Sequence, residues 1–149
     1  MSPRTRTPPL IPSRALLVSG RFSARLSAEA VAAALARGLR AGGAPLPDIA
    51  PLAREDDARE LAELDFDRRM LEARAVIIAV AALDMHTIAR GIAFEVATRA
   101  RQAGVPAYAV ARESRLGSFD ARLLDLQLVL QARTPRALSA AGRRLAQVL

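Results

Sequence analysis

Residues 75–82, AVIIAVAA, decide the fold that this sequence predicts. Every residue in the run is apolar, so it lacks the alternation of polar and apolar positions that marks a strand with one face in water. An apolar run of this length is typical of a strand buried on both faces at the centre of a parallel sheet. It therefore predicts a layer of helices on each side of the sheet.

Shorter apolar runs before and after this segment predict the other strands. They lie at 14–18, 48–53, 107–111 and 126–130, which gives a sheet of about five strands. Pro51 lies in the second of these runs and has no N–H to donate to a neighbour. We therefore expect that strand to be short or to lie at an edge of the sheet.

Helical patterns separate the strands. Ser27 is a typical N-cap for a helix that ends at Gly42. Further helices are predicted at 57–72 and at 85–103, and Gly104 ends the latter.

The last helix begins at Thr134 and Pro135, because an N-cap followed by Pro at the first helical position is a typical helix start. The side chains expected to face the core are Val31, Leu35 and Leu39 in the first helix, Leu61, Leu64 and Met70 in the second, Ile88, Ile92 and Val96 in the third, and Leu138, Leu145 and Val148 in the last.

Strands that alternate with helices predict right-handed βαβ units and a Rossmann-like, three-layer α/β/α sandwich with a mostly parallel sheet. We expect residues 14–149 to form this single domain. Residues 1–13 combine Pro with Ser, Thr and Arg and predict a flexible tail. Ligands in such folds bind beyond the carboxyl ends of the strands, so functional residues are expected in the loops at 19–26, 54–57, 81–87 and 112–119.

The composition restricts the chemistry. With no Cys and one His, the sequence holds no thiol nucleophile, no disulfide framework and no cluster with zinc-ligand spacing. The formal charge of +7 suits anionic partners, either nucleic acid or a small anionic ligand or nucleotide, and does not choose between them. Aromatic residues make up only 3%, which disfavours nucleic acid because little is available for base stacking.

No apolar run approaches the ~18 residues of a membrane span and the start of the chain has no signal-like apolar segment, so we expect a cytoplasmic protein without a membrane partner.

A resemblance to a known family begins at residue 16. Residues 16–39, LLVSGRFSARLSAEAVAAALARGL, resemble the amino terminus of type I glycerate kinases, in which a strand precedes D-S-F-K-G-S-L-S-A and an Ala-rich helix. Residues 51–58 lie where that family carries P-x-A-D-G-G-E-G-T. Residues 78–91 lie where it carries T-G-E-G-R-L-D-x-Q-T-L-x-G-K, and Leu83, Asp84 and Thr87 match this motif.

The resemblance implies a kinase that uses ATP and Mg²⁺ to phosphorylate glycerate. Phosphoryl transfer depends on groups that hold phosphate and metal in place. The candidate catalytic residues are Asp84, His86 and Thr87, of which Asp84 and Thr87 match the family's motif and His86 stands in place of its Gln. The candidate substrate or phosphate contacts are Ser23, at the family's Lys position, and Arg21, Arg25 and Arg90, which could bind an anion near helix N-termini. Asp56 and Asp57 are the candidate metal ligands.

The chain departs from the family where phosphate is held. Ala79, Val80 and Ala81 replace a Gly-Glu-Gly sequence, and Ser23 stands where the family has Lys. Glycine allows the backbone to approach phosphate closely, so these changes predict weakened or lost catalysis with a residual anion or nucleotide site. The chain is also much shorter than the family's members and is expected to lack the second domain of their cleft.

Other readings of the same residues stay open. Asp84 also suits the N-cap of a helix, and exposed Arg side chains are often only solvated. The 52% hydrophobic content and the Ala-rich helices also suit a non-catalytic interaction module, as a homodimer or as part of a larger assembly. Nucleic-acid binding through the Arg surplus is a third alternative.

Overall fold

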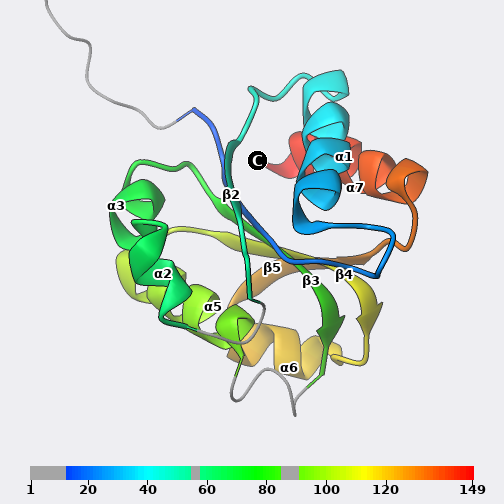
Figure 1. The fold of residues 1–149 in the computed structure, drawn as a ribbon. Coiled ribbons are helices and arrows are strands. Elements are labelled where there is room, and N and C mark those ends of the chain that lie inside the picture. The colour runs from blue at the N-terminus through cyan, green and yellow to red at the C-terminus, as the bar shows by residue number, and fades with distance from the viewer. Residues whose placement is uncertain (1–12, 55–57, 85–90) are drawn as a thin grey trace, which may run out of the picture.

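The apolar runs form one parallel sheet in the computed structural model of the chain, which describes residues 13–54, 58–84 and 91–149. The strand order is β2-β1-β3-β4-β5, and every neighbouring pair is parallel (Figure 1). The predicted central strand lies in the middle, and the strand that contains Pro51 lies at an edge, as predicted. The strands are β1 (Leu16–Ser19), β2 (Asp48–Pro51), β3 (Val76–Leu83), β4 (Ala107–Ser114) and β5 (Leu126–Gln131).

Helices cover both faces of this sheet, which confirms the three-layer prediction (Figure 1). One layer consists of α1 (Ala28–Ala41) and α7 (Pro135–Val148). The other consists of α2 (Glu60–Glu63), α3 (Phe66–Leu71), α5 (Ile92–Ala103) and α6 (Ser118–Leu123). The predicted caps are present, since the side chain of Ser27 accepts from Ala30 N and that of Thr134 accepts from Ala137 N.

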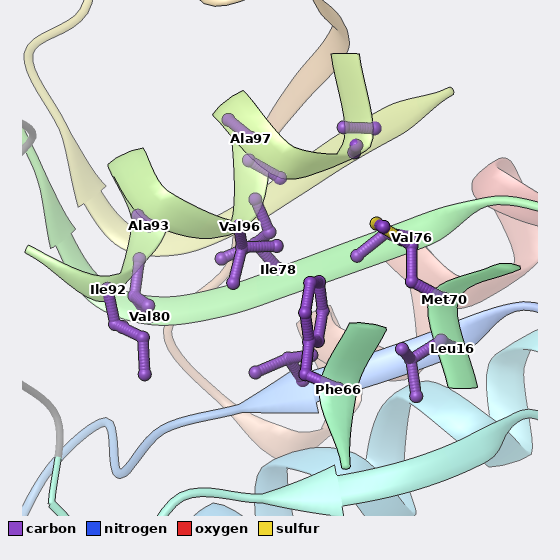
Figure 2. Packing of buried hydrophobic residues seen from close by; sticks show 14 of the residues in the cluster. Leu16, Phe66, Met70, Val76, Ile78, Val80, Ile92, Ala93, Val96 and Ala97 are labelled. Atoms are coloured by element: carbon purple, nitrogen blue, oxygen red, sulfur yellow. The ribbon is translucent and has the colours of Figure 1, made fainter. Parts of the chain in front are cut away.

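The two faces of β3 belong to two separate cores. Ile77 and Ala79 pack among the buried residues of α1 and α7. Val76, Ile78 and Val80 pack on the other side, where Figure 2 shows them with Phe66 and Met70 of α3 and Val96 of α5. Each fully buried side chain of this size contributes about 1.5–3 kcal/mol, so β3 links the two layers energetically.

The structure corrects the helix predicted at 57–72. Two short helices, α2 and α3, replace it because Asp65 adopts the left-handed conformation with φ of 54°. Asp tolerates this region better than most residues. The break turns Phe66 inward, and its side chain is 1% exposed.

The structure also differs from the predictions at one helix start, one additional helix and one expected core position. The helix predicted at 85–103 is observed from Ile92, and residues 85–90, with Ile88, lie outside the described residues. Helix α6 was not predicted, because its six residues bury no side chain and so carry no periodic signal. Val148 was expected to face the core but is 48% exposed. The tail prediction also falls largely outside the described residues, which begin at Ser13.

Helices α1 and α7 touch backbone to backbone at a pair of glycines. A Cβ placed on Gly142 would lie 2.9 Å from Gly38 Cα and would collide with the carbonyl oxygen of Leu35. The last turn of α7 is also joined to the sheet, because Tyr108 Oη of β4 donates a hydrogen bond to Val148 O at 3.4 Å. Glycine at both positions is therefore what allows the two helices to form one layer.

We predict that Gly142→Ala destabilises the protein. Helix propensity alone would raise the free energy of unfolding by about 1 kcal/mol. Overpacking against rigid backbone costs about 1–3 kcal/mol or more, so the net result is a loss. Urea denaturation measures it, with exposed Ala140→Gly reporting the propensity contribution of the same helix. A Gly142→Ala variant more stable than the wild type would show that the helices are free to move apart.

Candidate functional site

The strand order places the candidate site at the carboxyl edge of the sheet. From β1 the chain crosses to β2 on one side and then continues from β3 on the other, so the connections that follow β1 and β3 diverge. In doubly wound sheets with this order, the crevice at such a switch point is where ligands bind. The segments that begin at Gly20, Leu52 and Asp84 therefore share one edge, as the sequence analysis required.

The segment after β1 is held closely against the sheet. Ser19 is fully buried, and its Oγ donates a 2.9 Å hydrogen bond to Ala28 O at the start of α1. Gly20 N donates to Ala79 O of β3 at 2.7 Å. Phe22 and Leu26 are buried in the core beneath α1 and α7. The loop therefore has a fixed backbone, with its apolar side chains facing inward.

The predicted anion-binding residues of this loop are partly accessible. Arg21 and Arg25 are exposed, and Ser23 is half-buried. The hydroxyl of Ser23 accepts a 3.2 Å hydrogen bond from Arg25 N, so this side chain stabilises the turn itself. Both Arg residues belong to the segment that follows β1, at the edge where the switch point lies.

The segment after β2 is held by a residue that the sequence analysis missed. Glu60 of α2 is 4% exposed, and its carboxylate accepts hydrogen bonds from the backbone N–H groups of Ala53 and Arg54. Leu52 N also donates to Ser19 O at 2.7 Å. The signal for Glu60 was its spacing, because it lies one turn before Leu64 on the inward side of the helix. Its carboxylate fixes the path of the chain at the edge of the sheet.

Of the remaining predicted site residues, only Asp84 lies within the described ranges. Asp84 follows β3 directly and is half-buried. The next loop lies against it, since Arg115 N donates to Leu83 O at 2.8 Å. The predicted metal ligands Asp56 and Asp57, and His86, Thr87 and Arg90, lie outside the described residues. Within the described ranges, no group of His, Asp and Glu has the arrangement of a metal site.

A pair of residues with shifted pKa values, Asp48 and Arg69, lies at the opposite end of the sheet. Arg69 of α3 donates to both carboxylate oxygens of Asp48, at 2.9 and 2.6 Å. These hydrogen bonds lower the pKa of Asp48 and raise that of Arg69. Arg69 also donates to the carbonyl oxygens of Leu64 and Ile49. The pair therefore joins α3 to β2 and serves the structure rather than a ligand.

Comparisons with known proteins agree on the fold and go no further. No family model matches the chain, and neither does any curated protein. A crystal structure from Burkholderia pseudomallei, described as a "putative pilus assembly-related protein", aligns over 91% of this chain and 90% of its own, with a TM-score of 0.53 and 20% identity. The chain is thus an α/β protein of Rossmann-like architecture. No helix in the described ranges is long and apolar enough to cross a membrane.

We predict that Glu60→Ala destabilises the chain by about 1–3 kcal/mol, because two N–H groups at the edge of the sheet lose their acceptor. Glu60→Gln keeps one acceptor oxygen and should lose less. Glu63→Ala changes an exposed carboxylate of the same helix and should stay within about 0.5 kcal/mol of the wild type. Urea denaturation compares the variants. Equal stabilities for Glu60→Ala and Glu63→Ala would show that the segment after β2 does not depend on Glu60.

Proposed function

We propose that this protein is a non-catalytic interaction module that forms homodimers through the surface of α6 and β5. The observation that carries the proposal is the unusual exposure of apolar side chains on α6. Phe119 is 65% exposed and Leu123 is 52% exposed, although both belong to a regular helix. Monomeric proteins seldom leave neighbouring large apolar residues in water, so such a surface favours a protein partner.

A hollow lies beside these residues. Its volume is about 610 Å³, and residues from the start of α6 and from β5 line it. Strand β5 is an edge strand, so it has β4 on one side only. We call Phe119, Leu123 and this hollow the dimer surface. The apolar residues that line the hollow are Leu116, Ala121, Leu126, Leu128 and Val129.

A second copy of the chain is the partner that suits this surface best. Helix α6 carries the exposed aromatic ring of Phe119 and also contributes residues to a hollow that is partly apolar. Under two-fold symmetry, each copy can then place Phe119 against the hollow of the other. Arg122, which lines the hollow, and Asp125 are exposed and carry opposite charges that can pair across the symmetry axis. A role in an assembly is also in keeping with the words that describe the structural neighbour.

We predict that the wild-type chain has about twice its 15.9 kDa mass in light scattering at micromolar concentrations. Phe119→Glu places a charge at the centre of the contact and should weaken dimerisation at least about 30-fold, as expected for a hot-spot residue. Leu71→Glu is the matched control, because Leu71 of α3 is 64% exposed but lies away from α6. A wild type that stays monomeric at every concentration, or equal weakening by both substitutions, would contradict the proposal.

We also propose that an anion or nucleotide site of the glycerate-kinase-like type remains at the carboxyl edge. The supporting observation is the strand order, in which β2, β1 and β3 are neighbours and end at one edge of the sheet, where doubly wound sheets bind ligands. The exposed guanidinium groups of Arg21 and Arg25 would bind the anion, and the carboxylates of Asp56, Asp57 and Asp84 would hold a magnesium ion.

Calorimetry with Mg-ATP and with glycerate tests this second proposal. We expect measurable heat at millimolar ligand from the wild type, and binding at least tenfold weaker in Arg21→Gln/Arg25→Gln. One lost charge-assisted hydrogen bond already corresponds to about a tenfold change. Arg101→Gln removes an exposed Arg of α5 and should bind like the wild type. No heat from either ligand would end this proposal and would leave the dimer proposal unaffected.

A further inference from the structure

The positive charge of the chain is concentrated in the segments that build one helical layer. Segments 13–47 and 132–149, which contain α1 and α7, hold nine Arg and a single acidic residue, Glu29. Segment 48–131, which contains the opposite layer, holds eleven Arg and fourteen acidic residues. The net charge of the first two segments is therefore +8, which exceeds the +7 of the whole chain.

This excess reaches the surface of both helices. Arg37 and Arg40 of α1 are exposed, and so are Arg136, Arg143 and Arg144 of α7. We call these five residues the basic face. Helix α7 has no acidic residue. The apolar sides of both helices are directed at the sheet, so the charged side is the one that meets solvent.

Ion pairing differs between the two layers. In the layer formed by α2, α3, α5 and α6, several cations are neutralised by nearby carboxylates. In the described part of the chain, by contrast, no residue of the basic face takes part in an ion pair. The ion pairs of the opposite layer are Arg68 with Asp65 and Glu72, Arg69 with Asp48, and Arg99 with Asp67 and Glu95.

The close approach of α1 and α7 makes these charges one surface. Because Gly38 and Gly142 let the backbones touch, α1 and α7, the two helices that carry these cations, lie side by side over the sheet (Figure 1). Arg136 and Arg143 lie seven residues apart on one side of α7, or about 10.5 Å along its axis. A partner with regularly repeated negative charge can therefore contact several guanidinium groups at once.

We propose that the basic face binds the phosphate backbone of double-stranded nucleic acid without reading its sequence. Contacts to phosphate need cations and no aromatic rings, whereas a single strand is bound largely by stacking. The exposed positions of α1 and α7 carry Arg, Ala, Gln, Glu29 and Pro135, with Val148 only at the end of α7. Helices that insert into a membrane surface instead present Phe, Trp or Leu, so a lipid partner is less well matched.

Fluorescence anisotropy with a short labelled DNA duplex tests the proposal on the full chain. If about four phosphates are neutralised, the affinity should fall roughly 10²-fold between 50 and 200 mM salt. Arg143→Gln/Arg144→Gln should weaken binding at low salt and reduce the salt slope by nearly 2. Arg68→Gln/Arg101→Gln removes the same charge from exposed residues of α3 and α5 and should leave the slope unchanged.

Competing partners give distinct outcomes. The matching single strand should bind more weakly than the duplex, and vesicles containing phosphatidylserine should bind no better than neutral ones. Binding to those vesicles without binding to the duplex would overturn the proposal, as would equal effects of the two double substitutions. Phe119→Glu should still bind duplex, because α6 covers the other face of the sheet. A failure of the nucleic-acid proposal can therefore be told apart from a failure of the dimer proposal.

Discussion

The structure depends on the burial of β3 on both of its faces. Ile77 lies on one face of this strand and Ile78 on the other, so a layer of helices must cover each face and exclude water from it. Each layer then needs the crossovers that carry the chain from one parallel strand to the next. The order of the sheet and the position of its carboxyl edge follow from this requirement. The candidate anion site is therefore a result of the same constraint that stabilises the core.

The two helical layers satisfy this constraint in different ways. Where α1 and α7 meet, small residues allow direct backbone contact, and the charges are left for solvent or a partner. The opposite layer uses larger side chains such as Phe66 and Met70 and balances its charges internally. It leaves apolar side chains exposed on α6 instead. The protein thus presents two chemically distinct surfaces on opposite sides of one sheet, and the two can be occupied independently.

Strong local signals made much of the fold predictable. The apolar run at 75–82, the caps at Ser27 and Thr134, and the stop at Gly104 each depend on one residue type or one short pattern. The break at Asp65 was not predictable, because tertiary packing of Phe66 overrides a helical pattern that is continuous in the sequence. Glu60 was missed for a similar reason, since the N–H groups of Ala53 and Arg54 that donate to its carboxylate meet it only when the segment after β2 is in place. For the candidate site, the sequence predicted correctly that the loops after β1, β2 and β3 begin at one edge of the sheet. The roles of the charged residues in these loops were not predictable, because the spacing of residues in the sequence does not define the positions of loops.

One feature of the core also makes the protein convenient to observe. Tyr108 is the single tyrosine, and the sequence contains no tryptophan. Its ring is buried on the side of the sheet that α1 and α7 cover, and its hydroxyl donates a hydrogen bond to the carbonyl oxygen of Val148 at the end of α7. Ultraviolet emission from the whole molecule therefore originates at one defined position. Undocking of the carboxyl-terminal turn changes the environment of that ring, so the native chain carries an optical reporter that needs no label.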